Sequence, residues 1–218
     1  MKPLIIFGAG DFAQIAHFYF KRSRKYRVQA FVVDDAFIKE KRFDRLPVVG
    51  MSQIGNFSPR KYSAFVAVGY SRMNSVRQKK YEHLKSLGYT MASYISPECV
   101  CLTDDIGDNC FILEDNTIQP FVKIGNNVTL WSGNHIGHHA EIGDHCFIAS
   151  HVVVSGRVKI ENNCFVGVNA AIYDHVLVRQ RTLIGAGALV AKDTEEGAVY
   201  KSAPTATSVL KSGQLKGF

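Results

Sequence analysis

The sequence contains no apolar run long enough to cross a lipid bilayer. Its longest such runs, LIIFGAG from Leu4 and AFVAVG from Ala64, are far shorter than the roughly 20 residues of a membrane-spanning helix. The first residues, MK, lead directly into a strand-like segment, without the apolar core and small-residue cleavage site of a secretory signal peptide. We therefore expect no transmembrane segment and a cytoplasmic protein.

Paired cysteines are also lacking. The 218 residues include 5 cysteines, an odd number, and no CxxC motif. This pattern excludes the dense disulfide framework of small secreted domains. Cys99 and Cys101 are close in sequence, but two thiols without a second pair are weak evidence for a metal site. We predict structural roles for the cysteines and no bound metal.

Acidic residues are scarce in the first part of the chain. Residues 1–92 contain 17 Lys and Arg against 6 Asp and Glu, whereas residues 93–218 contain 9 against 13, so the basic excess behind the net charge of +7 belongs to one half. We expect no nucleic-acid partner. The densest basic run, KRSRKYR from Lys21, has two interpretations: a solvated helix end, or long-range attraction of a polyanionic small molecule such as a nucleotide diphosphate.

From Val100 onward, every sixth residue is aliphatic. The series is Val100, Ile106, Ile112, Ile118, Ile124, Leu130, Ile136, Ile142, Ile148, Val154, Ile160, Val166, Ile172, Val178, Ile184 and Val190. Small residues dominate the position four later, which includes Cys110, Cys146 and Cys164. An internal repeat of this regularity indicates a repeat architecture.

A period of six fits neither an α-helix nor an alternating strand. It fits a triangular coil of three short strands, with the aliphatic residue inside and about five coils in this stretch. Glycine after the aliphatic residue, as in IGDN and IGNN, permits a tight corner. Residues one coil apart then stack, which predicts an interior ladder for Cys146 and Cys164 and amide hydrogen bonds between Asn116 and Asn134.

Strand and helix patterns alternate in the first 92 residues. Strands are predicted at 4–7, 28–35, 46–50 and 64–70, with helices after the first strand and at 73–89. Such alternation favours a parallel sheet of Rossmann type. About 92 residues provide too few strands to bind a dinucleotide, so a mononucleotide fits better.

The first strand ends in a glycine turn. Gly8, Gly10 and Ala13 fit the GxGxxG/A fingerprint, and Asp34 follows at the end of the second strand. Free N–H groups at the start of the next helix favour an anion there, although a plain strand-to-helix turn has the same sequence. The predicted nucleotide contacts are Gly8, Ala9, Gly10, Asp34 and Asp35, together with Gly69 and Tyr70 after the next long strand.

The hexapeptide pattern, the FGAG turn and the joining segment SYISPECV are together similar to one subfamily of hexapeptide-repeat sugar acetyltransferases. The subfamily includes sialic acid O-acetyltransferases and N-acetyltransferases of nucleotide-linked 4-amino-dideoxy sugars. The resemblance implies a Rossmann-like nucleotide-sugar domain at 1–92, a left-handed parallel β-helix at 93–206 and a tail at 207–218. It also implies a homotrimer with acetyl-CoA between neighbouring β-helices.

The histidines suggest where the chemistry occurs. Four of the 8 histidines lie in WSGNHIGHHAEIGDHC, and acetyl transfer needs a base and donors to the developing oxyanion. By resemblance, His138 is the catalytic base and Gly156, one coil later, is the glycine whose N–H faces the acetyl carbonyl. The family usually has Asp or Glu where this chain has His139, so Glu141 or a carboxylate of a neighbouring subunit is the alternative partner.

Further site residues follow from the resemblance. The predicted CoA contacts are Phe147, Gly156, Ala186, Lys192 and Pro204. Trp131 and Asn134 are candidates for the acceptor sugar or for packing. His135, His139, His145 and His151 have predicted roles at the surface or in trimer packing.

The expected function is acetyl-CoA-dependent N-acetylation of a nucleotide-linked amino sugar of the 4-amino-4,6-dideoxy type, for surface polysaccharide or glycan synthesis. Three alternatives stay open at this point. They are O-acetylation of a sugar such as sialic acid, a zinc enzyme of carbonic anhydrase type, and a non-catalytic nucleotide-sensing protein.

Overall fold

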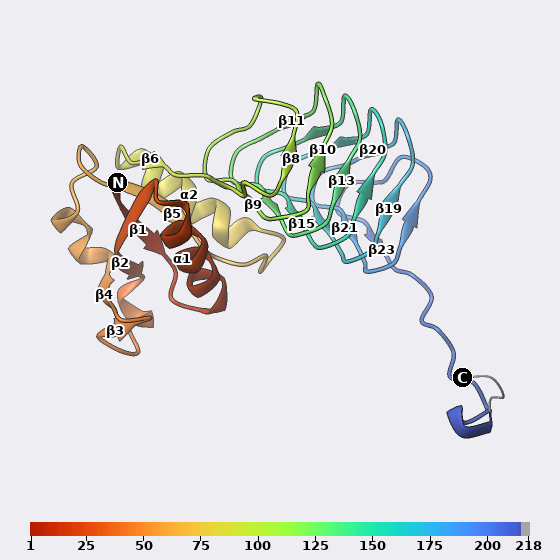
Figure 1. Ribbon diagram of the computed structural model, residues 1–218, viewed down its shortest axis with the longest axis horizontal. Helices are drawn as coiled ribbons and strands as arrows, with labels where there is room; N and C mark the ends of the chain where they lie inside the picture. The colour runs from red at the N-terminus through yellow and green to blue at the C-terminus, as the bar shows by residue number, and fades with distance from the viewer. Residues whose placement is uncertain (215–218) are drawn as a thin grey trace.

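The computed structural model describes residues 1–214 and consists of an α/β unit followed by a parallel β-helix. Figure 1 shows the α/β unit packed against the first coils of the β-helix, with the C-terminal tail extending away from the last coil. The tail is exposed from Lys201 and ends in a short 3₁₀ turn, η3 (Ser212–Gln214). No helix within residues 1–214 combines the length and apolar character needed to cross a membrane.

The α/β unit has one six-stranded sheet of order β3-β4-β2-β1-β5-β6. Its strands are β1 (Lys2–Phe7), β2 (Tyr26–Val33), β3 (Arg42–Phe43), β4 (Leu46–Gly50), β5 (Ser63–Val66) and β6 (Thr90–Met91). All neighbouring pairs are parallel except β3 and β4. The central strands are apolar and buried on both faces, as expected for a parallel sheet covered on both sides.

Two helices and two 3₁₀ turns connect these strands: α1 (Asp11–Ser23), η1 (Asp35–Phe37), η2 (Met51–Asn56) and α2 (Ser75–Ser86). The helix α1 begins after Gly10, with Asp11 in its first turn and Lys21 and Arg22 in its last, which complements the helix dipole. The helix predicted at 73–89 is shorter at both ends. It begins only after Asn74, whose left-handed backbone ends the preceding loop.

The β-helix has three faces, each a parallel sheet. The first face contains β7 (Tyr94–Ile95), β9 (Phe111–Ile112), β12 (Thr129–Leu130), β15 (Phe147–Ile148), β18 (Phe165–Val166), β21 (Leu183–Ile184) and β23 (Val199–Tyr200). The second contains β8 (Val100–Cys101), β10 (Thr117–Ile118), β13 (His135–Ile136), β16 (Val153–Val154), β19 (Ala171–Ile172) and β22 (Leu189–Val190). The third contains β11 (Lys123–Ile124), β14 (Glu141–Ile142), β17 (Lys159–Ile160) and β20 (Leu177–Val178).

Residues eighteen apart pair across neighbouring coils, as the period predicts. Ile136 pairs with Val154 and Val154 with Ile172, and the ladder residues from Ile112 to Val190 form one buried core. The first coil is an exception, because Cys101 and not Val100 pairs with Ile118 and Val100 is 54% exposed. A terminal coil is hydrogen-bonded to a neighbouring coil on one side only. Its pairing register is therefore less constrained than that of an inner coil. The predicted fold class, a Rossmann-like α/β domain followed by a left-handed parallel β-helix, is confirmed.

The predicted interior ladders are also confirmed. Cys146 and Cys164 are fully buried, in the same core as Cys110. Asn134 Nδ2 donates to Asn116 Oδ1 at 2.9 Å, and Asn134 Oδ1 accepts from the backbone N–H of Val152 at 2.8 Å. These amides satisfy buried polar groups along the axis of the coil.

The α/β unit covers the first face of the β-helix. The outward residues of β9, β12, β15 and β18 on this face are Phe111, Thr129, Phe147 and Phe165, and all are buried or half-buried. Phe12 from α1 packs edge-on against Phe111, with ring centroids 5.4 Å apart. The core of the α/β unit therefore continues into the β-helix, and the two parts share one apolar cluster.

Candidate active site

The corner between β13 and β14 holds His138 at the surface. The sequence IGHH forms this corner because Gly137 lies against the next coil, where a Cβ would come within 2.7 Å of the backbone nitrogen of Gly156. The backbone N–H of His138 donates to Gln119 Oε1 at 2.8 Å. The imidazole is exposed, so it is accessible to a substrate.

Two neighbours define the position of the His138 ring. Its Nδ1 lies 3.1 Å from Nδ1 of His139, within hydrogen-bond distance. Its Nε2 faces Gly156 on the next coil, where a Cβ would lie only 3.0 Å from this atom. Residues 1–214 contain no hydrogen-bond partner for Nε2. The ring therefore presents one nitrogen to a neighbouring histidine, whereas the other lies above a glycine and has no hydrogen-bond partner within residues 1–214.

His139 is suited to accept a hydrogen bond from His138. Its backbone is left-handed, with φ 59°, and its ring lies over Phe121 with centroids 4.7 Å apart. Partial desolvation lowers the pKa of His139 below that of an ordinary histidine, and the charges of Arg157 and His138 lower it further. His139 thus stays neutral to lower pH and retains a lone pair for the Nδ1–H of His138.

The chain's own carboxylates are placed differently from the prediction. Glu141, the predicted partner within the chain, faces Lys159 Nζ at 3.5 Å. Asp174 lies two coils beyond His138 on the same corner row, and its Oδ1 accepts the backbone N–H of Gly156 at 2.8 Å. The prediction that this N–H is a free oxyanion donor is therefore wrong for the structure, because a carboxylate already occupies it.

The predicted CoA contacts separate into two groups. Ala186, Lys192 and Pro204 are exposed, and Lys192 lies on the same corner row as His138 and Gly156. Phe147 is only 4% exposed, beneath the rings of Tyr70 and Phe165. Its prediction as a CoA contact is wrong, because it faces outward on the one face that the α/β unit covers.

Burial also decides the role of the other candidates near His138. Asn134 is 1% exposed and its amide is used inside the coil, so the structure assigns it to packing. Trp131 is half-buried between Phe12 and Phe147 at the seam between the two parts. His145 is buried, and its Nδ1 lies 2.9 Å from Asn127 Nδ2. His135 and His151 are exposed.

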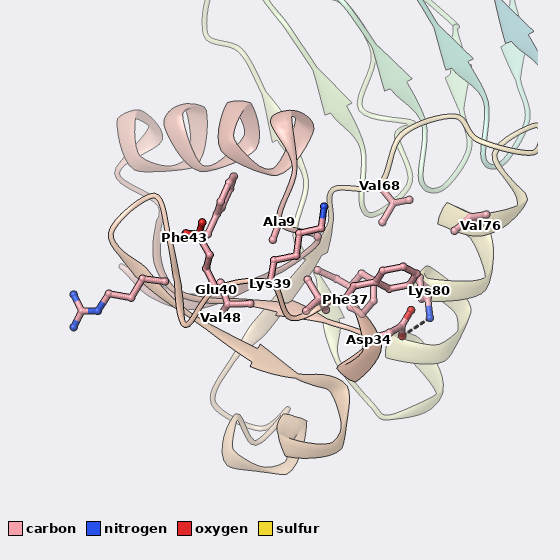
Figure 2. Close-up of a pocket in the computed structure, with 14 residues that line it drawn as sticks. Ala9, Asp34, Phe37, Lys39, Glu40, Phe43, Val48, Val68, Val76 and Lys80 are labelled. Carbon is pink, nitrogen blue, oxygen red and sulfur yellow. Dashed lines mark hydrogen bonds and ion pairs between the residues drawn. The ribbon is translucent and has the colours of Figure 1, made fainter.

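A pocket of about 600 Å³ opens at the carboxyl ends of β1, β2 and β5. Figure 2 shows it extending from Phe43 and Val48 at one end to Val76 and an ion pair at the other. That pair joins Asp34 Oδ1 to Lys80 Nζ at 2.6 Å. The carboxyl edge of such a sheet is where ligands of α/β proteins bind.

The predicted nucleotide residues are only partly brought together. Gly8, Ala9 and Asp34 line the pocket, and Gly8 has φ 124°, which favours glycine. Gly10 and Gly69 are not among the residues that line it.

Asp35 and Tyr70 do not line the pocket, so their predicted nucleotide contacts stay predictions. Asp35 accepts from the N–H and hydroxyl of Ser52, and these hydrogen bonds lower the pKa of its carboxyl. Tyr70 packs on Phe147 and Phe165 of the β-helix, with ring centroids 5.0 and 4.7 Å away. Both side chains point to other parts of the fold.

Sequence reasoning missed most of the pocket lining. Lys39 and Arg42 come from the loop and short strand after η1, and Lys80 comes from α2. Lys80 Nζ also lies over the ring of Phe7, 5.3 Å from its centroid. No local motif marks these residues, because only the fold brings them to the end of β1.

No three His, Cys, Asp or Glu side chains within residues 1–214 are grouped as a metal site would require.

Family comparisons agree with this arrangement. Residues 3–84 match the PglD N-terminal domain. Residues 105–137 and 121–156 match the bacterial transferase hexapeptide (six repeats), and residues 157–192 match the hexapeptide repeat of succinyl-transferase. These matches cover the α/β unit and most of the β-helix. The chain has no significant sequence match among curated proteins.

Several solved structures share the fold of this chain. The acetyltransferase domain of PglB from Neisseria gonorrhoeae, in complex with acetyl coenzyme A, is 20% identical, with TM-score 0.81 over 93% of this chain and 99% of that one. PerB from Caulobacter crescentus, in complex with CoA and GDP-perosamine, is 22% identical, with TM-score 0.81 over 93% and 98%. WeeI from Acinetobacter baumannii is 19% identical, with TM-score 0.79 over 91% and 96%.

Proposed function

We propose that this chain transfers an acetyl group from acetyl-CoA to the amino group of a nucleotide-linked sugar of the 4-amino-4,6-dideoxy type. The observation that carries the proposal is the exposed His138 ring, whose Nε2 lies above Gly156 without a hydrogen-bond partner within residues 1–214. The pocket at the carboxyl edge of the sheet supports the nucleotide part. Similar structures hold acetyl coenzyme A in PglB, and CoA with GDP-perosamine in PerB.

In the proposed mechanism, His138 Nε2 takes the proton of the sugar amine as its nitrogen attacks the acetyl carbonyl. A C–N bond forms and the C–S bond to CoA breaks, after which the imidazolium returns the proton to the leaving thiolate. His139 accepts the hydrogen on Nδ1 of His138 and so keeps the proton-accepting nitrogen at Nε2. Gly156 leaves room for the His138 ring because it has no side chain.

The same geometry supports the predicted homotrimer. The α/β unit covers the first face of the β-helix, whereas His138 lies on the corner between the second and third faces, on the opposite side of the triangle. A nucleotide sugar held in the pocket would therefore meet His138 of a neighbouring protomer. Acetyl-CoA would lie between β-helices, along the row that includes Gly156 and Lys192, with Ala186 and Pro204 as further predicted contacts.

The test measures acetyl transfer from acetyl-CoA to a panel of TDP-, UDP- and GDP-linked amino sugars. At least one should be acetylated on nitrogen, and His138→Ala should lower turnover by roughly 10²- to 10⁴-fold with the fold intact. His83→Ala, an exposed histidine on α2, is the control. Unchanged turnover in the His138 variant would show that His138 is not the base. Transfer only to a hydroxyl acceptor such as sialic acid would contradict N-acetylation.

A further inference from the structure

The α/β unit has a second groove, at the opposite edge of its sheet from the pocket. It measures about 960 Å³ and is bounded by α1, the first residues of β1 and β2, and the turn between β3 and β4. Because parallel strands begin at one edge and end at the other, a ligand here would not share the space of the nucleotide pocket.

This groove contains most of the KRSRKYR run. Lys21, Arg24, Arg27 and Arg45 line it, and all four are exposed. None of the four forms an ion pair with any carboxylate of residues 1–214. The one carboxylate in the lining, Asp44, already faces His17 Nδ1 at 2.6 Å. The groove therefore has a large uncompensated positive charge.

Two of these arginines have backbone conformations that disfavour a side chain. Arg24, directly after α1, has φ 54°, and Arg45, in the β3–β4 turn, has φ 68°. Glycine is the usual residue at the end of a helix and in such a hairpin turn. Arginine occupies both positions here, which adds two cations to the groove.

Exposed apolar side chains border the same cations. Phe18 on α1 is 55% exposed and Met1 is 78% exposed, and both line the groove. The guanidinium of Arg22 lies over the Phe18 ring, 5.4 Å from its centroid. Lys2 and Lys25 are exposed beside these residues in sequence and extend the positive surface.

We propose that this surface, which comprises α1 residues 18–22, the following Arg24 to Arg27, Arg45 and Met1, binds the anionic headgroups of a lipid bilayer. A free phosphate would favour a small site with at least one buried cation, whereas every cation here is exposed and they spread over three elements. A free phosphate would also have no contact for Phe18. A bilayer interface supplies both a sheet of negative charge and an apolar layer for the ring.

The test uses the full chain and sedimentation with lipid vesicles. The protein should bind vesicles that contain phosphatidylglycerol at low ionic strength, and it should be released as salt approaches about 0.5 M, because salt screens charges at the bilayer surface. Vesicles of phosphatidylcholine alone should retain little. Retention equal on both vesicle types would overturn the proposal.

Variants identify the surface. Changing Lys21, Arg24 and Arg27 to Glu should lower binding to anionic vesicles at least tenfold, because each cation near such a surface adds attraction. The matched control changes three exposed cations elsewhere to Glu, namely Lys79, Arg181 and Lys201, and should retain most of the binding. Equal loss of binding in both variants would show that binding depends only on the net charge of the protein, which would overturn the proposal.

Two further measurements separate the ligand types. Phe18→Ser should weaken vesicle binding at unchanged charge. Inorganic pyrophosphate at matched ionic strength should not displace the protein from vesicles. Selective displacement by pyrophosphate would assign the groove to a soluble phosphate and contradict the proposal. Vesicle binding is independent of the proposed acetyl transfer, so either proposal can fail alone.

Discussion

At the scale of single residues, the contact between His138 and His139 distinguishes this chain from the pattern that it resembles. A carboxylate in the place of His139 would stabilise the protonated form of His138, whereas a neutral imidazole only orients it. The active site as proposed thus works without a negative charge beside Nδ1 of His138, its base. This difference has a measurable consequence in the pH dependence of turnover.

We predict that His139→Asp moves the acid limb of the pH–rate profile to higher pH. The new carboxylate favours the imidazolium, which raises the pKa of His138, so the base becomes protonated, and inactive, at a higher pH than in the parent. In the parent, the lowered pKa of His139 keeps this residue neutral, so it places no negative charge beside Nδ1 of His138. The measurement is kcat/KM for acetyl transfer between about pH 5 and 9.

His175→Asp is the matched control, because His175 has the same left-handed corner position two coils later, with φ 64°. Its profile should stay close to that of the parent. An acid limb that is unmoved in His139→Asp would show that His139 does not orient the base.

At the scale of secondary structure elements, α2 joins the two parts through Arg77. Burial lowers the pKa of its guanidinium to about 10, and no carboxylate within residues 1–214 pairs with it. Its donors bind Thr129 Oγ1 at 2.6 Å and the carbonyl oxygens of His145 and Cys146 at 3.0 Å. One side chain of α2 thus holds two neighbouring coils of the β-helix.

We predict that Arg77→Met lowers the free energy of unfolding by about 2 kcal/mol, because buried acceptors lose a charged donor and methionine offers none. Removal of a buried charge offsets part of this effect, but methionine replaces none of the hydrogen bonds that the Arg77 guanidinium donates. Urea unfolding followed by the fluorescence of Trp131, the only tryptophan, measures the change at the seam. Lys79→Met, at an exposed position on the same helix, should change the stability by less than about 0.5 kcal/mol.

At the scale of the whole molecule, the α/β unit and the β-helix share a core. Phe111 and Leu113 of the β-helix are buried in one cluster with Leu4 and Phe65 of the α/β sheet. A boundary drawn between the two sequence patterns therefore cuts through an apolar interface, and the two parts are expected to unfold together.

We predict that a fragment of residues 93–218 is destabilised and associates. Removal of the α/β unit would expose the outward aromatic residues of the first face, among them Phe111 and Phe147, as a continuous apolar strip. The fragment should bind a hydrophobic dye and melt at lower temperature than the full chain. A monodisperse fragment with the melting temperature of the full chain would contradict the shared core.

The sequence alone was sufficient for the fold and for the placement of His138 at a corner of the β-helix. A period of six over sixteen positions allows one solution, since the aliphatic residues from Ile112 to Val190 must be inside and each corner is repeated. That register also separates His138, at a corner, from His135, which lies on a strand. Local patterns are informative wherever a contact lies within one coil or one turn of the chain.

Only the tertiary structure decided which of the predicted residues meet. Phe147 and Tyr70 were expected at ligand sites, but they pack on each other because the α/β unit covers the first face. Asp174 reaches the N–H of Gly156, and Lys80 reaches Asp34, across separations that no local motif marks. A period determines which side of its own coil a residue occupies. What lies against that side depends on how separate elements pack, which no single segment encodes.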